Sequence, residues 1–311
     1  MSKHKFHWVQ LAFQLKGSVI PSIVDRVVLC GLFGVFISTI HFFGFHVSKP
    51  IFGTVIPSIV LGLLLVFRTN TAYERFWEGR KCWGNLVNNT RNLARQILIS
   101  IKEIGPQDRA KKISVLRLVL AFAVATKLHL RGEPVNAELE ELMSSEQYIK
   151  LKTMNHPPLE IAFWIGDYLQ HQAARQKLDP YYLPTIQGLL NNLVDNLGSC
   201  ERILKTPIPL AYAIHLKQLL LLYCLLLPFQ LIEELGWLTG PTVALVSFTL
   251  FGIEAIGIEI ENPFGYDAND LPLDAICATM QRNIEDLISL MPPVETYTGE
   301  SLEDSRFLDK G

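Results

Sequence analysis

The stretch Pro50–Arg80 constrains the fold more than any other part of the chain, because its two halves have opposite character. Ile51–Phe67 contain no charged residue and consist mainly of Leu, Ile, Val and Phe. As a helix these residues rise about 25 Å at about 1.5 Å per residue, close to the hydrocarbon thickness of a bilayer. Arg68 then opens a charged run interleaved with aromatics, as where a helix leaves lipid. The stretch predicts a membrane span; the alternative is a buried helix of a large soluble core.

Composition agrees with a membrane protein that has a substantial polar part. Hydrophobic residues make up 49% of the 311 residues and charged residues 19%. The net charge of -2 gives a nucleic-acid partner no electrostatic support. The five cysteines are scattered and form no CxxC, so reduced, buried thiols are predicted in place of disulfides or a zinc site. No signal peptide is expected.

Four apolar runs predict four spans in two helical hairpins. Val27–Val47 and Ile51–Phe67 form the first hairpin, joined at Ser48-Lys49-Pro50. The third span starts near Pro207, and the fourth is Val243–Ile258. Arg and Lys crowd before the first span, after the second and before the third. The positive-inside rule therefore places both hairpin turns outside and both termini in the cytosol, in a plasma (inner) or thylakoid-type membrane.

The rest of the chain predicts polar helices, so the fold class is all-α. Residues 68–205 show helical periodicity with many charges and no convincing strand alternation. Ser114–Lys127 is apolar but interrupted by Arg117, which favours a buried helix of a cytosolic bundle over a span. A further amphipathic helix is expected at Asp274–Leu290. The segments are 1–67 with spans one and two, 68–205 cytosolic, 206–260 with spans three and four, and 261–311 cytosolic.

Enzyme functions find little support. The chain has no GxGxxG, P-loop, GxSxG or HExxH motif, and no catalytic residue, cofactor or confident metal site is predicted. Within the predicted spans only Glu254 and His41 offer reactive groups, so an intramembrane enzyme is a remote alternative. Four spans are few for one pore, so a channel would be shared among copies around an axis. The other alternative is a non-conducting scaffold anchored in the membrane.

Three motifs then carry a family resemblance over nearly the whole chain. FRTNTAYERFWEGR after the second span resembles the FRTN-x-x-Y-x-R-F-x-E-x-R signature of bestrophins, most closely their bacterial and plant-plastid branch. GSCERILKTPIPLAYAIHLK before the third span and IENPFGYDANDLPLDAICATMQRN after the fourth resemble the same family. The resemblance implies a homopentameric ion channel in the lipid bilayer, with one central pore.

The resemblance also implies two constrictions. In this family the second helix lines an apolar neck at positions i, i+4 and i+8, which match Ile59, Leu63 and Phe67, with Val55 one turn earlier. Residues four apart share a helix face, and rings of them can gate by dewetting. The alternative is that this stripe packs against neighbouring helices. The second constriction matches Tyr181, or Leu183 nearby, and a surface loop is the alternative.

Animal bestrophins bind calcium after the NPFG motif, where this chain retains Asn262, Asp267 and Asp270. Calcium takes six to eight oxygens and this segment supplies few charged ones, so at most a weak or structural cluster is expected. Capping of the following helix by Asn269 or Asp270 is the alternative role.

Charged residues near the predicted spans bear on whether anions or cations permeate. Acidic residues near the inner membrane edge would favour cations if they faced the pore; these are Glu254, Glu259 and Glu261. Basic residues would favour anions if they faced it; these are Arg68, Arg75, Arg80 and Arg91. By analogy with the plastid branch, the FRTN signature favours a channel for chloride and other monovalent anions. A monovalent-cation channel of the same family is the alternative.

Overall fold

The structure is a computed structural model and describes residues 13–48 and 55–291, which are almost entirely helical. Its elements are α2 (Ile20–Phe42), α3 (Val55–Ser100), α4 (Pro106–Arg131), α5 (Ala137–Glu140), α6 (Ser145–Leu151), α7 (Pro157–Ala174), α8 (Leu183–Lys205), α9 (Leu210–Leu235), the 3₁₀ helix η2 (Gly236–Leu238), α10 (Thr239–Glu259) and α11 (Leu273–Ser289). No β-strand occurs in the described ranges, where an isolated antiparallel bridge pairs Ile101 with Leu178. The prediction of an all-helical chain is confirmed.

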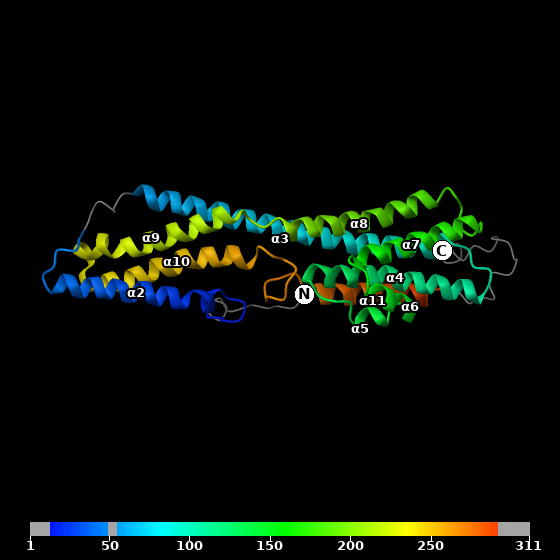
Figure 1. Cartoon of the computed structure of the whole chain (residues 1–311), viewed down its shortest axis with the longest axis horizontal. Coiled ribbons are helices and arrows are strands. Elements are labelled where there is room, and N and C mark those ends of the chain that lie inside the picture. The colour runs from blue at the N-terminus through cyan, green and yellow to red at the C-terminus, as the bar shows by residue number, and fades with distance from the viewer. Residues whose placement is uncertain (1–12, 49–54, 292–311) are drawn as a thin grey trace, which may run out of the picture. The chain divides into compact units, whose positions relative to one another are not determined.

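The chain divides into two compact units (Figure 1). Unit 1 holds the residues up to Arg80 together with Ile203–Leu271, and unit 2 holds Lys81–Arg202 together with the residues from Pro272 onward. Helix α3 runs unbroken for 46 residues and contributes to both units. The apolar run before Arg68 and the charged run after it are therefore parts of one helix, which rises about 69 Å at about 1.5 Å per residue.

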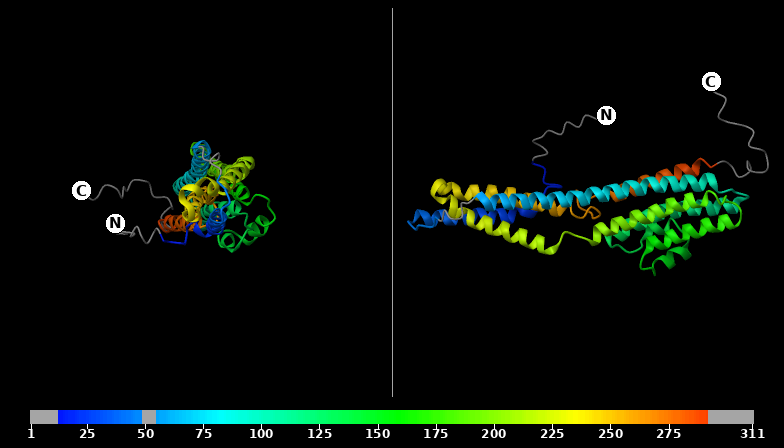
Figure 2. Two further views of the ribbon diagram at one scale, coloured as in Figure 1. Left: turned by 90° about the vertical axis from the view of Figure 1, so that its left-hand side faces the viewer. Right: turned by 90° about the horizontal axis from the view of Figure 1, so that it is seen from above.

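Unit 1 packs α2, α9, α10 and the first part of α3 side by side (Figures 1 and 2). Its core is apolar and consists of Ile23, Cys30, Leu61, Leu65, Leu216, Leu220, Cys224, Leu227, Val243, Phe251 and Ala255. The connection between α9 and α10 was predicted as a turn over Gly236–Pro241. It is instead the single 3₁₀ turn η2, and α10 begins at Thr239, which makes the hairpin tighter than expected.

Helices α2 and α10 approach each other through small residues. A Cβ placed on Gly240 would lie 2.5 Å from Val35 Cγ2 and 3.1 Å from the Val35 backbone nitrogen. A Cβ on Gly34 would lie 2.9 Å from Gly240 Cα. Close backbone approach of this kind is a common way for helices to associate in a membrane, where dispersion contacts replace the hydrophobic effect. The glycines therefore set the distance between these two helices.

Burial separates the apolar helices into two kinds. Three described stretches are long and apolar enough to cross a membrane: Ile20–Phe42, Pro106–Arg131 and Leu210–Glu259, the last covering α9 and α10. Only 33% and 22% of the first and third windows are buried within the protein, whereas 78% of the α4 window is buried. The apolar character of α4 is accounted for by burial inside unit 2, as its interruption by Arg117 predicted. The other two stretches expose apolar side chains, as lipid-facing helices do.

Unit 2 surrounds α4, which packs against α7 and α11. Lys127 on α4 is buried and is held by two carboxylates, with its Nζ 2.7 Å from Glu138 Oε2 and 2.8 Å from Asp274 Oδ1. Burial alone would lower the pKa of Lys127, but the hydrogen bonds to Asp274 and Glu138 outweigh it and raise that pKa. Helix α4 ends at Gly132, whose φ of 68° lies in the left-handed region that favours glycine.

All five cysteines are free and buried, as the sequence predicted. Cys30 and Cys224 belong to the apolar core of unit 1, and the chain uses them there as small apolar side chains.

The glycine contact yields a test of the packing. Gly240→Ala should lower the free energy of unfolding by about 1–3 kcal/mol, because the new methyl group meets the backbone of α2. Gly252→Ala is the matched control on the same helix, since its Cβ would meet only Ile23 Cδ1 at 3.8 Å. Thermal unfolding of the detergent-solubilised protein, followed by circular dichroism, measures both. Equal melting temperatures for the two variants would contradict the close approach.

Candidate functional site

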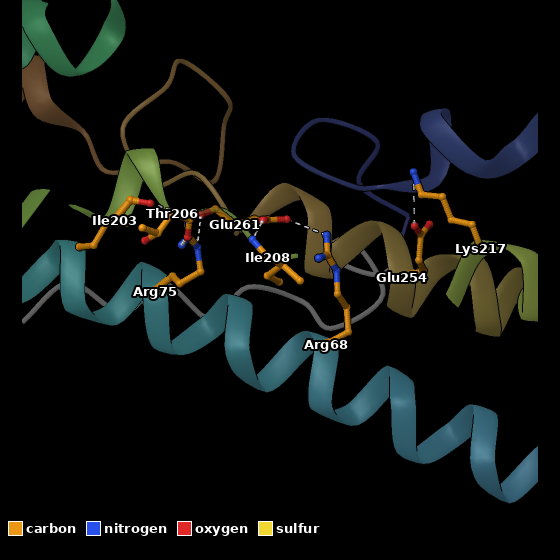
Figure 3. A network of polar contacts seen from close by, with 8 residues as sticks. All are labelled: Arg68, Arg75, Ile203, Thr206, Ile208, Lys217, Glu254 and Glu261. Carbon is orange, nitrogen blue, oxygen red and sulfur yellow. Dashed lines mark hydrogen bonds and ion pairs between the residues drawn. The ribbon is translucent and has the colours of Figure 1, made fainter. Parts of the chain in front are cut away.

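A buried ion pair lies where the apolar part of α3 ends. Arg68 is 5% exposed, and its Nη2 donates a hydrogen bond of 2.6 Å to Glu261 Oε2 (Figure 3). The other oxygen of the same carboxylate, Oε1, accepts a hydrogen bond of 2.9 Å from the backbone nitrogen of Ile208. A buried guanidinium needs such a partner, because an unpaired charge in a low-dielectric interior costs several kcal/mol. Glu261 therefore joins α3 to the chain that leads into α9.

Arg75, two turns further along α3, binds backbone carbonyl groups only (Figure 3). Its Nε donates to the carbonyl of Glu261 at 3.2 Å, and its two terminal nitrogens donate to the carbonyls of Thr206 and Ile203. Ile203 and Thr206 lie at the C-terminal end of α8, where carbonyl groups lack intrahelical partners. Burial lowers the pKa of Arg75, although Glu261 and Glu78 oppose this. Arg75 on α3 thus supplies hydrogen-bond donors to the carbonyl groups at the C-terminal end of α8.

These contacts bring together the three sequence motifs that carried the family resemblance. Arg68 and Arg75 come from FRTNTAYERFWEGR, Ile203 and Thr206 from GSCERILKTPIPL, and Glu261 from IENPFGYDAND. From the sequence, Glu261 was considered only as a charge near the pore, and this network was not predicted. The signal was present, because three polar motifs each border an apolar run.

The structure also bears on the charges considered for ion selectivity. Arg68 is paired with Glu261, and the guanidinium of Arg75 is bound to backbone carbonyls, so the hydrogen-bonding groups of both are engaged within unit 1. Arg80 and Arg91 are exposed, and Arg91 Nε donates to Asn283 Oδ1 at 2.6 Å. Two of the four arginines weighed above are therefore structural.

The acidic residues are likewise engaged within unit 1. Glu254 is 3% exposed on α10, with Arg26 Nη1 at 3.9 Å from one carboxylate oxygen. Lys217 Nζ lies 4.0 Å from the other oxygen (Figure 3). Glu259 Oε1 accepts a hydrogen bond of 3.1 Å from Asn269 Nδ2. With Glu261 paired to Arg68 and Glu254 near two basic side chains, two of these three carboxylates face opposite charges, which weakens the argument for cations drawn from them.

One face of α3 is apolar and uncovered in the single chain. Ile59, Leu63 and Phe67 are 63%, 53% and 55% exposed, whereas Leu61 and Leu65 on the opposite face are buried in the unit 1 core. Val60 and Val66 are also exposed, so at about 100° per residue the open face spans about 120° and is centred on Leu63. The predicted stripe occupies this open face. Val55 is the first residue of α3, and its side chain lies outside the part that the structure describes.

Tyr212 on α9 fixes the rotation of α3 at this level. Its hydroxyl donates a hydrogen bond of 2.6 Å to the backbone carbonyl of Leu64, next to the centre of the open face. That carbonyl would otherwise bond only within the helix. The contact presents Leu63 outward and Leu65 inward, because the helix cannot turn about its axis without breaking it.

Tyr181 and Leu183 lie at the start of α8 in unit 2. Tyr181 is 90% exposed in the turn that precedes the helix, and its backbone nitrogen donates 2.9 Å to Asp179 Oδ1. Leu183 is the first residue of α8 and is half-buried. Tyr181 therefore projects from the chain, whereas Leu183 is partly covered, and a cytosolic constriction at Tyr181 stays a prediction.

Asn262, Asp267 and Asp270 shape a loop. Asp270 Oδ2 accepts a hydrogen bond of 2.8 Å from the Asp267 backbone nitrogen, and Asn262 Oδ1 accepts one of 3.3 Å from Phe264. A Cβ on Gly265 would lie 2.7 Å from Asp270 Oδ2, so the loop requires glycine there. Asn262 and Asp270 therefore help to shape this loop, and a weak calcium site here stays a prediction.

The expected helix cap at this loop is wrong. Helix α11 begins at Leu273 with Pro272 as its N-cap and no capping side chain. Asn269 Nδ2 instead donates to Glu259 and, at 3.2 Å, to the carbonyl of Gly17, so it ties down the segment before α2.

A sequence profile of the family described as "Bacterial/Fungal Bestrophin protein" matches residues 1–286. The chain belongs to the bestrophin family.

Relatives of this bestrophin are named as channel proteins. It is 70% identical over 297 residues to a voltage-dependent anion channel-forming protein of Nostoc sp., covering 96% of this chain and 97% of that one. It is 33% identical over 279 residues to a protein of the same description from Escherichia coli K12, covering 88% and 90%. Both matches extend over most of the chain.

Solved structures agree with the fold. The crystal structure of a bacterial bestrophin homologue from Klebsiella pneumoniae matches with a TM-score of 0.78 and 29% identity, covering 87% of this bestrophin and all of that chain. The family recognised from three motifs is thus confirmed by whole-chain likeness.

The ion pair gives a prediction for this bestrophin. Glu261→Gln leaves the buried Arg68 without a counter-charge while keeping an acceptor for Ile208, and should cost about 3–5 kcal/mol of stability. Glu259→Gln, two residues away, is the control, because an amide oxygen can still accept from Asn269. Melting temperatures in detergent report the difference. In the double variant with Arg68→Gln the loss should be smaller than the sum of the single losses, and strict additivity would refute the pairing.

Proposed function

We propose that this bestrophin forms a homopentameric channel that conducts chloride and other monovalent anions passively across a membrane. The names of relatives that match nearly the whole chain support an anion channel. The observation that carries the proposal is the open apolar face of α3, centred on Leu63 and held by Tyr212 and the Arg68–Glu261 pair. A face so apolar in a single chain requires lipid or further copies to cover it.

In the proposed assembly Ile59, Leu63 and Phe67 line a neck on the central axis, with Val55 one turn before them. Rings of such side chains offer no partner to a hydrated ion, so passage depends on water entering the neck. An apolar neck selects by dehydration and does not determine the sign of the ion. Anion selectivity is therefore supported by the names of the relatives, and a monovalent-cation channel is the alternative to be tested.

The proposed topology has four spans, α2, the start of α3, α9 and α10, with both termini and unit 2 in the cytosol. The exposed apolar surfaces of α2, α9 and α10 support it, as does the charge asymmetry of the flanking segments. Tyr181 would form a second constriction in the cytosolic part. The host membrane is a plasma (inner) or thylakoid-type membrane.

The assembly is tested by mass. Because the spans of one copy are too few to enclose a pore, the protein in mild detergent should have a multiple of the mass of the 35.1 kDa chain, and the proposed pentamer has five times that mass. Mass photometry or native mass spectrometry measures this directly. A clean monomer would favour a membrane-anchored scaffold that does not conduct.

Ion selectivity is tested with purified protein in a planar bilayer. Under a chloride gradient the reversal potential should lie near the chloride equilibrium value, and replacement of sodium by a large organic cation should leave it almost unchanged. A reversal potential that follows sodium would overturn the anion assignment and keep the channel. No current from verified pentamers would remove the channel proposal.

The neck is tested with alanine. Ile59→Ala, Leu63→Ala and Phe67→Ala should each raise the open probability or conductance, because every subunit widens its ring and removes apolar surface. Leu221→Ala is the matched control, an apolar residue on α9 that is 50% exposed. Leu61→Ala should lower stability by about 2–5 kcal/mol through a core cavity, without raising current. Currents are compared at equal pentamer yield. If Leu221→Ala alters gating while the three stripe variants match the parent, α3 does not line the neck.

A further inference from the structure

Two histidines and a glutamate from three helices of unit 2 meet at one point that the proposed channel does not use. His129 Nε2 lies 2.6 Å from Glu201 Oε1, and His156 Nε2 lies 2.9 Å from the same oxygen. The two imidazole rings are 4.6 Å apart, and the three ligand atoms all lie within 4.8 Å of one another. The three side chains are partly buried, so the cluster is neither sealed in the core nor free on the surface.

The fold positions each of the three side chains firmly. His129 is in the last turn of α4, just before the glycine that ends the helix. His156 is the N-cap of α7, fixed by the two prolines that follow it, and its Nδ1 accepts a hydrogen bond of 3.3 Å from the Leu159 backbone nitrogen. Glu201 projects from α8.

We propose that His129, His156 and Glu201 bind a divalent transition-metal ion, with zinc as the best fit. Two imidazole nitrogens and one carboxylate oxygen form a ligand set that zinc accepts in sites that keep a fourth position open. Ligand atoms around a tetrahedral ion lie roughly 3.4 Å apart when each bond is about 2.1 Å, and the two nitrogen–oxygen distances need to lengthen by less than 1 Å to reach this. The hard, oxygen-only preference of calcium and magnesium argues against those ions.

A cavity beside His129 gives room for a fourth ligand. It has a volume of about 620 Å³ and is lined by His129 together with residues of the α4–α5 and α6–α7 connections, among them Lys152, Asn155 and Pro157. Water or a small anion in this cavity would complete the coordination. The ion would join the ends of α4, α7 and α8 within unit 2.

The hydrogen bonds of His156 determine which ring nitrogen carries the proton. Because His156 Nδ1 accepts from Leu159, the proton of the neutral ring is on Nε2 and points to Glu201. Metal binding through Nε2 requires this proton to move to Nδ1, so the ring stays neutral, no proton is released from it, and the hydrogen bond from Leu159 is lost.

The experiment titrates zinc into the full-length protein in detergent, after removal of bound metal with a chelator, by calorimetry and by competition with a chromophoric chelator. One zinc per chain is expected, and cobalt should give the intense visible absorption of a tetrahedral nitrogen–oxygen site. His129→Gln, Glu201→Gln and His156→Asn should each weaken binding at least about tenfold, since even loss of an outer partner costs 10–100-fold. Asn at position 156 retains an N-cap acceptor, so this variant keeps α7 capped.

His171→Gln is the control. His171 is an exposed histidine with a carboxylate 3.6 Å away, which resembles a surface metal contact without a third ligand. The proposal predicts that this variant binds zinc as the parent does, and that zinc raises the melting temperature of the parent but not of His156→Asn. It is overturned if the parent binds no zinc in the presence of the competing chelator, or if all three site variants, folded by circular dichroism, bind as tightly as the parent.

Discussion

The ion pair between Arg68 and Glu261 is the interaction on which the arrangement of unit 1 depends. A guanidinium that is almost fully buried is stable only where a carboxylate meets it, and Glu261 does so while also accepting from the start of the segment before α9. Arg75 then binds the carbonyl groups that end α8. These contacts join α3, the end of α8, the segment before α9 and the segment after α10. The apolar helices that extend from these contacts need few polar contacts of their own, because their entry points are already determined.

Local patterns predicted most helices well, because each helix is defined by residues close in sequence. The fourth apolar run was predicted as Val243–Ile258 and is α10, Thr239–Glu259. The amphipathic helix predicted at Asp274–Leu290 is α11, Leu273–Ser289. The continuity of α3 through Arg68 was not predicted. A change from apolar to charged residues marks a change of surroundings, and Glu and Arg are good helix formers that do not end a helix.

Interactions between distant residues were beyond the sequence. Arg68 and Glu261 are 193 positions apart, and many other pairings of arginine and glutamate were equally compatible with the sequence. The cluster of His129, His156 and Glu201 follows no short spacing, since its members meet only when three helices pack. For α3 the apolar run is uniform on all sides, so its periodicity could not select a face. The buried side of the helix, marked by Leu61 and Leu65, supplies that direction, and the stripe inferred from family resemblance lies on the opposite side.

Because α3 is one uninterrupted helix, its apolar and polar halves are in a fixed angular phase. Leu63 and Arg75 are separated by about three turns of the same helix. The hydrogen bonds from Arg75 to the end of α8 therefore set the direction in which Leu63 faces outward. A single residue inserted between them would turn the open face by about 100°, whereas seven inserted residues would return it to within about 20°. The number of residues between Leu63 and Arg75 thus determines the direction of the open face, whatever the chemistry of those residues.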